Sequence, residues 1–538
     1  AGYYGHASVG CLHIRPVINL KNQVGVDQMT SIADSVSDLV LEFGGSLSGE
    51  HGDGLVRSSF NKKMFGSKIY NAFNDVKLAF DPNNIMNPGK IVDSQSIQEN
   101  LKIGPNYKPE HIKTNFNFHK ENGFNSAIEM CNGQGACKKI TGGTMCPSYM
   151  VTRDEEHSTR GRANALRGYI SGELTAENSM DRIREVLDLC LECKACKSEC
   201  PSNVDMTKLK YEFLHQYHQN KRYSLRDFIF GNFRKFAQYG SVMAPISNWV
   251  MRNDIFRKIL FSFIGIDHRR KIPAFAQHSF TNWYQNNRNI FGPHKKNSTK
   301  VILFPDTFTN YNHPEIGINT YKVLVSLGYE VVVPELKCCG KPLLSKGMLP
   351  KAKSLASENI KILSQIIDDD SVIVGIEPSC LLTIFDDYPD LLNQDLEIKN
   401  IINKVMLVGD LIVRDFSKGL PDKLFKAVDS KVLFHGHCHQ KSLFGTSKIN
   451  QLLNLLPSIV VEEIQSGCCG MAGTFGFESE HYEISIKMAK KNLVDKIKSQ
   501  SGDFLLVSDG ISCRQQIDHT LGIKSLHAMD LFASLLID

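Results

Sequence analysis

The chain has 538 residues, of which 42% are hydrophobic and 22% charged, a composition typical of folded proteins with two to four domains. Its formal net charge of +5 is spread along the sequence rather than gathered in one tail, so nucleic-acid binding is not indicated. The sequence lacks the run of about eighteen apolar residues that a membrane-spanning helix needs, and no signal peptide opens it.

The sequence contains 15 cysteines. Without a secretory signal, so many thiols indicate metal and cluster ligation in a reducing compartment rather than disulfides. We therefore expect a cytoplasmic protein, either free or peripheral at the inner face of a membrane.

Residues 1–95 combine two histidines with a glycine-rich loop. The spacing of apolar residues predicts helices over about 27–43 and 62–80, with the loop Ser48–Gly54 between them. Imidazoles and a carboxylate are suitable ligands for a divalent metal and can leave positions open for a substrate. Such ligands could come from His6, His13 and Glu50, although a histidine taken alone is more often an ordinary hydrogen-bonded side chain.

Three pieces of this segment resemble the C-terminal part of the flavin-linked oxidases of the vanillyl-alcohol-oxidase type, especially the D-2-hydroxyacid dehydrogenases. The matching pieces are His6-x6-His13, Ser48-Gly-Glu50-His51-Gly and Phe80-Asp-Pro-x3-Met86-Asn-Pro-Gly-Lys90. The resemblance implies that a divalent metal, with zinc as first choice, is held by His6, His13 and Glu50. It also implies that His51 is the general base and a substrate ligand.

Arg15 departs from this family, whose members commonly have Asn two residues after the second histidine. A guanidinium can bind a second carboxylate through two parallel hydrogen bonds, which would suit a dicarboxylic substrate such as 2-hydroxyglutarate. A surface arginine without a role in binding is the alternative.

FAD is bound in this family mainly by an N-terminal domain with a glycine-rich pyrophosphate loop. Nothing in the sequence matches that loop. We therefore expect a fragment that begins inside the substrate domain and is inactive without the flavin domain.

Two cysteine runs follow a polar linker over residues 96–120. The second, Cys190-x2-Cys193-x2-Cys196-x3-Cys200-Pro201, has the spacing of bacterial ferredoxins that hold cubane iron–sulfur clusters. The first reads Cys131-x5-Cys137 and then Cys146-Pro147, with Gln134 where a middle cysteine is expected. Zinc is the alternative metal, although it usually takes two separated Cys-x-x-Cys pairs.

The cysteine before proline ligates the other cluster in two-cluster ferredoxins. On that logic, one [4Fe–4S] cluster is held by Cys146, Cys190, Cys193 and Cys196. The second site has the three thiols of Cys131, Cys137 and Cys200. These could hold a [3Fe–4S] cluster or a [4Fe–4S] cluster with a non-cysteine ligand, or the second cluster could be absent. Between the runs, Arg160 and Arg162 could screen cluster charge or form a solvated face.

Residues 211–291 are rich in aromatic and basic side chains. Helices of this composition can lie on an anionic membrane surface. They can also pack against the cluster domain with their basic residues toward water, and both interpretations stay open.

A repeat appears from about residue 298. Buried strands are predicted in the first copy at 301–306, 331–333 and 372–376, and in the second at 432–434, 459–461 and 504–507. Their alternation with helices predicts parallel α/β sheets with cysteines at the strand ends, where such sheets build sites.

This pattern resembles the paired cysteine-rich "CCG" domains of heterodisulfide reductase and of glycolate oxidase iron–sulfur subunits. The second copy keeps four thiols that could hold a cluster or zinc: Cys438, Cys468, Cys469 and Cys513. The first copy has Asp306 and Glu377 at positions where the family has cysteines, so its own thiols are weaker candidates: Cys338, Cys339 and Cys380. Three histidines flank Cys438 and could tune that site, meet a quinone, or be ordinary hydrogen-bonded side chains: His435, His437 and His439.

Together these resemblances predict an α+β and α/β multidomain protein. Its expected parts are a truncated FAD-oxidase C-terminal segment (1–95), a 4Fe–4S ferredoxin-type domain (120–215), a helical connector (216–297) and a duplicated CCG domain (298–425 and 426–538). In that order they resemble the bacterial proteins that fuse a flavin-linked D-2-hydroxyacid dehydrogenase to its own iron–sulfur subunit.

That resemblance implies oxidation of a D-2-hydroxyacid, D-2-hydroxyglutarate first, to the 2-oxoacid through FAD. Electrons would then pass singly through the clusters to a quinone or an electron-transfer protein. D-lactate and glycolate are the alternative substrates. The alternative function is a heterodisulfide-reductase-like electron-transfer component without substrate oxidation of its own.

Overall fold

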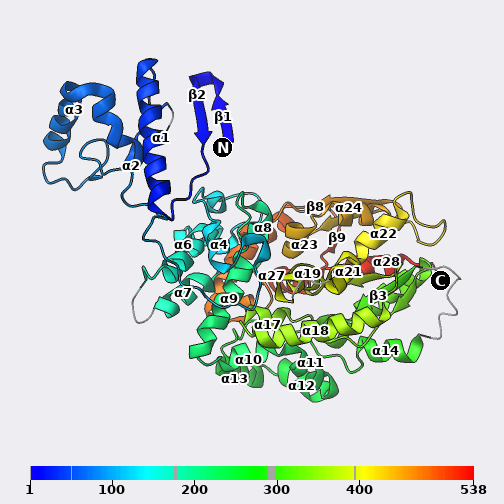
Figure 1. Cartoon of the computed structure of the whole chain (residues 1–538). Helices are drawn as coiled ribbons and strands as arrows, with labels where there is room; N and C mark the ends of the chain where they lie inside the picture. The colour runs from blue at the N-terminus through cyan, green and yellow to red at the C-terminus, as the bar shows by residue number, and fades with distance from the viewer. Residues whose placement is uncertain (1, 50, 175–178, 289–298, 393–395, 538) are drawn as a thin grey trace. The chain divides into compact units, whose positions relative to one another are not determined.

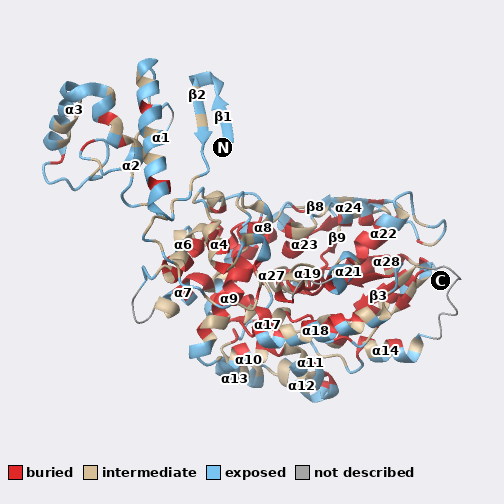
Figure 2. Ribbon diagram, viewed as in Figure 1, coloured by how far each residue is buried: buried red, intermediate tan, exposed pale blue. Residues whose placement is uncertain are grey.

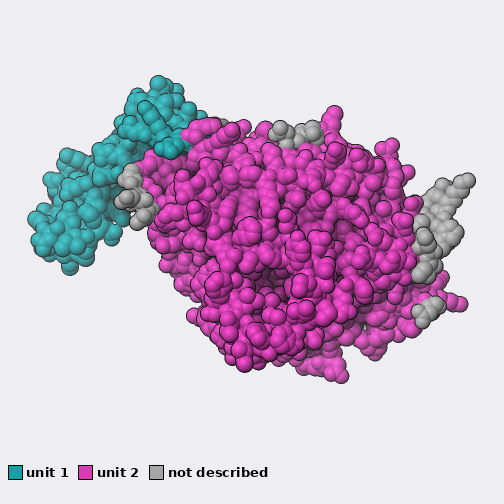
Figure 3. All heavy atoms as spheres, turned by 90° about the horizontal axis from the view of Figure 1, so that it is seen from below, with its two compact units in different colours: residues 1–110 teal, residues 111–538 magenta. Residues whose placement is uncertain are grey.

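The computed structural model describes residues 2–49, 51–174, 179–288, 299–392 and 396–537, so the predicted ligand Glu50 lies outside the described residues. The chain divides into two compact units, residues 1–110 and 111–538, which are described separately (Figures 1 and 3). Among the described helices, none is both long enough and apolar enough to cross a membrane.

Residues 1–110 contain an antiparallel β-hairpin and two long helices. β1 (Gly2–His6) and β2 (Cys11–Arg15) form the hairpin, in which His6 lies opposite Cys11. The helices are α1 (Gln23–Glu42) and α3 (Asn61–Phe80), with the short α2 (Gly54–Arg57) between them. α1 begins earlier than the predicted residue 27 because the Asn22 side chain accepts a hydrogen bond of 2.8 Å from Gly25 N and caps the helix.

Most side chains of residues 1–110 are exposed (Figure 2). Val26 of α1 is buried, but Ile32, Val36 and Leu39, which belong to the apolar stripe of the predicted helix, are 42%, 42% and 53% exposed. The stripe that predicted this helix is therefore only partly covered within the unit.

The cluster domain (residues 111–220) is a set of short helices around the cysteine runs. They are α4 (Phe124–Glu129), α5 (Pro147–Thr152), α6 (Thr159–Ile170), α7 (Ser179–Asp188), α8 (Ala195–Glu199) and α9 (Met206–Asn220). The side chains of Ser158 and Asp205 cap α6 and α9. Cys146 immediately precedes Pro147, which begins α5, so the thiol lies at a helix start.

The connector (residues 221–288) is helical and covers the lower side of residues 111–538 in Figure 1. Its helices are α10 (Leu225–Gly231), α11 (Phe233–Val242), α12 (Ala244–Arg252), α13 (Asp254–Ile264) and α14 (Phe280–Asn287).

The first repeat (residues 299–425) is built on a four-stranded parallel sheet in the order β4-β3-β5-β6. Its strands are β3 (Lys300–Phe304), β4 (Glu330–Val332), β5 (Val372–Gly375) and β6 (Val405–Leu407). Its helices are α15 (Thr307–Tyr311), α16 (Pro314–Ser326), α17 (Lys341–Ser345), α18 (Leu349–Ile366), α19 (Pro378–Asp386), α20 (Tyr388–Leu391), α21 (Leu396–Asn403) and α22 (Val408–Phe416).

The second repeat (residues 426–537) is built on a three-stranded parallel sheet in the order β8-β7-β9. Its strands are β7 (Ser430–Phe434), β8 (Ile459–Glu463) and β9 (Leu505–Val507). Its helices are α23 (Cys438–Leu443), α24 (Ser447–Asn454), α25 (Tyr482–Ala489), α26 (Asp495–Lys498), α27 (Ile511–Leu521) and α28 (Ala528–Leu535). The predicted parallel α/β arrangement is confirmed, and cysteines follow the carboxyl ends of the strands.

A buried ion-pair network joins the cluster domain to the first repeat. The ammonium of Lys194, whose side chain is fully buried, lies 2.6 Å from carboxylate oxygens of both Asp386 and Asp387. Lys197 also binds Asp386, and Lys208 binds Asp390 at the end of the same segment. Lys194 stands between two predicted ligands, Cys193 and Cys196, so the network fixes the cluster loop itself.

The network holds its charges in the ionised form. Burial alone would lower the pKa of Lys194, but Asp386 and Asp387 outweigh it and raise that pKa above its usual range. Burial alone would likewise raise the pKa of Asp386, yet Lys194 and Lys208 hold it well below its usual range. Removing one partner would therefore leave an uncompensated charge in the interior.

We predict that Asp387→Asn lowers the free energy of unfolding by about 3–5 kcal/mol, because Lys194 then loses a fully buried countercharge. The measurement is urea unfolding of the cluster-loaded protein under anaerobic conditions. Glu185→Gln is the matched control, since its pair with Arg182 is exposed and should contribute less than about 1 kcal/mol. Equal losses in the two variants would contradict the prediction.

Candidate iron–sulfur site

The four cysteines predicted to share one cluster lie together in the interior. They are Cys146, Cys190, Cys193 and Cys196, each buried and none in a disulfide. Burial raises the pKa of Cys193 well above its usual value, and the neighbouring thiols of Cys438, Cys196 and Cys146 add to this effect. Cys146, from the first run, thus lies among the thiols of the second run, as crossed ligation requires.

Arg162 tests whether this thiol set fits an anionic cluster. Its side chain is 0% exposed, and its guanidinium donates to Cys146 Sγ at 3.2 Å, to Ser148 Oγ and to the Val186 carbonyl. No carboxylate pairs with it among the described residues. Burial alone would lower the pKa of Arg162, but Cys146 and Cys190 outweigh it. A buried cation needs a countercharge, and thiolates holding iron would supply it, so the residues fit a [4Fe–4S] cluster.

The second thiol set is less closely gathered. Cys137 is buried and accepts a hydrogen bond of 3.3 Å from Arg160 N. Burial raises the pKa of Cys137, with Cys146 and Cys131 acting nearby. Cys200 directly follows α8, which packs against the turn Ala136–Lys138 that holds Cys137. Gln134, the residue in place of a cysteine, is exposed.

The four thiols of the second repeat also converge, although they come from three separate strand ends. The thiol of Cys468 lowers the pKa of Cys438 through a hydrogen bond, and hydrogen bonds from Cys468 and Cys513 lower that of Cys469. All four are buried. Four thiols linked by hydrogen bonds in this way are a suitable donor set for a soft metal or an iron–sulfur cluster.

Buried histidines surround this donor set. His439 Nδ1 lies 3.8 Å from Cys438 Sγ, and burial lowers the pKa of His439 to about 4, so the ring is neutral. Its Nε2 atom is buried without a hydrogen-bond partner among the described residues. Burial also lowers the pKa of His435, whose Nδ1 lies 2.6 Å from Ser466 Oγ. An orphaned buried ring nitrogen beside four thiols fits a site that accommodates a bound group.

The first repeat brings its three thiols together with two carboxylates. Hydrogen bonds link Cys338 to Cys339 and Cys339 to Cys380. Asp306 is buried and caps α15, accepting from the Phe308 and Thr309 amides. Glu377 likewise caps α19, and its other carboxylate oxygen accepts a hydrogen bond of 2.8 Å from Ile511 N, at the start of the helix that holds Cys513. Glu377 therefore lies at the junction of the two repeats.

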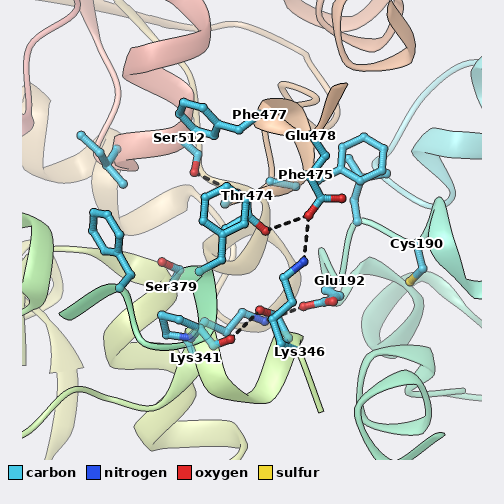
Figure 4. A pocket seen from close by; sticks show the side chains of 18 of the residues that line it. Cys190, Glu192, Lys341, Lys346, Ser379, Thr474, Phe475, Phe477, Glu478 and Ser512 are labelled. Atoms are coloured by element: carbon cyan, nitrogen blue, oxygen red, sulfur yellow. Dashed lines mark hydrogen bonds and ion pairs between the residues drawn. The ribbon is translucent and has the colours of Figure 1, made fainter. Parts of the chain in front are cut away.

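A cavity of about 210 Å³ lies where the cluster domain, the connector and both repeats meet (Figure 4). Its lining includes thiols from each side: Cys190, Cys380, Cys438, Cys468, Cys469 and Cys513. Phe475 and Phe477 contribute apolar wall, while Lys346 reaches Glu478 at 2.8 Å and Lys341 reaches Glu192 at 3.5 Å. Every charge of this lining that Figure 4 labels thus has an opposite charge beside it.

The cluster loop contacts the second repeat directly. Ser442 Oγ on α23 donates to the carbonyl of Cys193 at 3.1 Å, and α8 packs against α23. Cys438 begins that helix. The thiols around Cys193 and the thiols around Cys438 are therefore neighbours. Electron transfer between two such sites needs them to lie close together.

Residues 1–110 bring the predicted N-terminal ligands close together. The rings of His6 and His13 are 4.8 Å apart, and Tyr4, which pairs with His13 across the hairpin, stacks on it at 4.5 Å. The Arg15 guanidinium lies 5.1 Å from the Tyr4 ring. The loop before His51 passes the same hairpin, since a Cβ atom on Gly49 would lie 3.9 Å from Cys11 Sγ. Ligation by these residues stays a prediction.

Parallel sheets with cysteines at their strand ends, joined to a cysteine-rich helical domain, define an iron–sulfur oxidoreductase. Residues 1–91 match the family model described as "FAD linked oxidases, C-terminal domain", residues 125–204 match "4Fe-4S dicluster domain", and residues 305–385 and 432–518 match "Cysteine-rich domain". The chain belongs to the family of FAD-linked dehydrogenases that carry these iron–sulfur domains.

Known relatives agree with this assignment. The D-2-hydroxyglutarate dehydrogenases of Escherichia coli K12 and Pseudomonas putida are 24% and 28% identical over 99% and 98% of this chain. The alignments cover 56% and 55% of those relatives, so the chain spans about half their length. One of the subunits of anaerobic glycerol-3-phosphate dehydrogenase from Escherichia coli K12 is 30% identical over 59% of this chain and 78% of its own length.

Two features of the site were not predicted. Sequence left Arg162 open between a solvated face and a charge-screening role, and only its complete burial distinguishes them. The ring of His481 is held between Asp188 of the cluster domain and Glu478 of the second repeat, at 2.7 and 2.9 Å. No local motif marks a contact between residues almost 300 positions apart.

We predict that stability falls between about pH 6.5 and 9 because His481 loses its proton. Burial alone would lower the pKa of His481, but Asp188 and Glu478 outweigh it and raise the pKa to about 9. A raised pKa stabilises the fold fully below the unfolded value of about 6.5, and this contribution, up to ~3 kcal/mol, is lost as the pH passes 9.

The measurement is the thermal midpoint at pH 6.5 and pH 9 for the natural chain and for His481→Gln, which should show a flatter dependence. His519→Gln is the control, because burial lowers the pKa of His519 to about 4 and its ring stays neutral throughout this range. An unchanged slope in His481→Gln would contradict the assignment.

We further predict that the site of Cys131, Cys137 and Cys200 holds a [3Fe–4S] cluster in the oxidised protein. Electron paramagnetic resonance of anaerobically prepared, then oxidised, protein should show its signal. Gln134→Cys should supply the fourth thiolate and remove the signal as a [4Fe–4S] cluster forms. Asn132→Cys, two residues earlier in the same loop, is the control. Iron and sulfide for one [4Fe–4S] cluster alone would contradict this.

Proposed function

We propose that the full-length protein oxidises a D-2-hydroxyacid to the 2-oxoacid through FAD and passes the electrons through its iron–sulfur thiol sets to an acceptor. D-2-hydroxyglutarate is the first substrate, and D-lactate or glycolate are the alternatives. The observation that carries the proposal is the single chain that holds both a clustered His6–His13–Arg15 hairpin and two adjacent thiol sets.

The hairpin supports the substrate end. Alternate residues of a strand share a face, so His13 and Arg15 of β2 point to one side of the sheet. His6 lies close to His13 on the neighbouring strand. A metal bound by the two imidazoles would then sit on the face that presents the guanidinium. A dicarboxylic hydroxyacid could then bind the metal through one carboxylate and the Arg15 guanidinium through the other.

His51 would take the hydroxyl proton of the substrate, which a bound divalent cation would make more acidic. FAD supplies the hydride acceptor, and we propose that it is bound mainly by sequence outside this chain. Arg15 would hold the distal carboxylate and so set the position of the carbon that is oxidised.

The thiol sets support the electron-transfer end. Arg162 offers positive charge to the thiols around Cys146, and Ser442 ties the Cys193 loop to the helix that begins at Cys438. The cavity beside these thiols gives an acceptor space to approach them.

A second candidate is an electron-transfer component without substrate oxidation of its own. The cavity lined by thiols of both repeats favours it, since such a site could reduce an acceptor with electrons from any donor. The relative that is 30% identical is itself named as one of the subunits of a dehydrogenase.

We predict that full-length protein, purified anaerobically, reduces a dye acceptor with D-2-hydroxyglutarate faster than with D-lactate or glycolate. His51→Ala should lower turnover by about a hundredfold or more, because the general base is lost. Its visible cluster absorbance should not change. Exposed His111, outside the hairpin, gives the control variant His111→Ala.

If no D-2-hydroxyacid reduces the dye, the dehydrogenase proposal is wrong and the electron-transfer component is favoured. Full activity in His51→Ala would show that another group accepts the proton. Arg15→Met should raise KM for D-2-hydroxyglutarate more than for D-lactate if the guanidinium binds the second carboxylate.

A further inference from the structure

The outer face of the connector exposes a continuous series of large apolar side chains. They come from three consecutive helices, α11 to α13, and from Met243 between the first two, and each is at least 39% exposed. We call this surface the connector face; its residues are Phe236, Tyr239, Val242, Met243, Ile246, Trp249, Ile255, Phe256, Ile259 and Phe263. Figure 3 views residues 111–538 from the side on which these helices lie in Figure 1.

The connector face is unlike the rest of residues 111–538. Apart from Leu225 and Phe228 on the adjoining α10, exposed large apolar side chains described elsewhere in this unit occur singly: Ile140, Leu174, Leu396, Val460 and Ile537. Scattered apolar residues are normal on a protein surface, whereas a contiguous patch marks an interaction site.

The helices of the connector face expose most of their large apolar side chains, whereas core helices bury them. Their buried positions are the small residues Ala237, Ser241 and Ala244, with Phe261 of α13 as the large exception. Their large residues point outward, with Val242 80% and Phe263 78% exposed. Packing against the protein alone would favour the reverse distribution. The outward apolar face is therefore suited to a second apolar medium.

The basic side chains on the same helices favour binding to an anionic surface. Residues 233–263 contain five Lys or Arg residues and a single acidic residue, Asp254, which is paired with Arg257 at the edge of α13. Lys235, Arg252 and Lys258 are exposed. Aromatic and aliphatic side chains bordered by basic residues are the composition of helices that lie in an anionic membrane interface.

The helices of the connector face are too short to span a membrane. α11, α12 and α13 have 10, 9 and 11 residues. Each is about 15 Å long, half the roughly 30 Å of a hydrocarbon core. Such helices can lie flat with their apolar side chains at the level of the headgroups, as Trp and Tyr prefer.

We propose that the connector face binds the surface of an anionic lipid bilayer. The proposal goes beyond the proposed dehydrogenase function and does not depend on it. It has one structural consequence for that function. Phe233, which begins α11, and Phe230 of the adjoining α10 line the thiol cavity, so the cavity lies close to the bound membrane.

The test is vesicle flotation of the full-length, cluster-loaded protein. Vesicles of phosphatidylethanolamine and phosphatidylglycerol should carry the protein upward, vesicles of phosphatidylcholine should carry much less, and added salt should weaken the binding. Replacing Ile246, Trp249 and Phe263 together by Ser should lower the bound-to-free ratio by roughly tenfold or more, because three inserted apolar side chains are lost.

A matched triple variant removes the same number of exposed apolar side chains elsewhere: Leu174→Ser, Val460→Ser and Ile537→Ser. Its flotation should equal that of the natural chain. Dye-linked turnover and cluster absorbance should be unchanged in both triple variants, which separates membrane binding from the dehydrogenase function and from misfolding.

Failure of the natural protein to float with anionic vesicles would overturn the proposal. Equal flotation of the two triple variants would also overturn it. A dimer in solution that Ile246, Trp249 and Phe263 replacement converts to a monomer, without vesicle binding by either form, would assign the face to a second copy instead.

Discussion

The buried pairing of Lys194 with Asp386 and Asp387 is the constraint on which the electron-transfer half of the molecule depends. A cation between two predicted cluster ligands is held by two adjacent carboxylates of the first repeat, with side chains that are 0% to 8% exposed. Such a pair has little net stabilising value unless its geometry is good, but breaking it is costly. It therefore fixes where the cluster loop sits, and with it the contact of Cys193 with Ser442 on the second repeat.

The two repeats have diverged around this constraint. The second keeps four converging thiols with neutral histidines beside them. The first has carboxylates at two positions where its family has cysteines. Its helix α19 ends at Asp386, which pairs with Lys194 of the cluster loop. Glu377 also serves the junction, because it accepts a hydrogen bond from the Ile511 amide. A duplicated fold thus provides one thiol-rich half and one half that positions the cluster domain.

Sequence predicted the features that are local. Apolar runs predicted β3, β4, β5 and the three strands of the second repeat, and cysteine spacing predicted which thiols gather around Cys146. β6 was not predicted, because it passes directly into α22 at Val408 and no turn residue separates the strand from the helix. The Lys194–Asp386 pair joins residues that are 192 positions apart, and the His481–Asp188 pair joins residues that are 293 positions apart. No pattern within one segment can therefore reveal these contacts. For the connector both interpretations were kept, and the structure explains why: α11 and α12 bury small residues and expose large ones, while α10, α13 and α14 each bury an aromatic ring.

Lys194 and Arg162 together show how charge is distributed around the thiols of the cluster domain. Both cations are fully buried and both lie beside predicted ligands. Lys194 is neutralised by two carboxylates, so it contributes little net potential at the thiols. Arg162 donates to Cys146 Sγ and has no carboxylate partner among the described residues. Net charge and hydrogen bonds to sulfur are what tune the potential of a thiolate-held cluster. The Arg162 guanidinium, which no carboxylate of the described residues neutralises, therefore favours added negative charge at these thiols, while Lys194 serves to position the cluster loop.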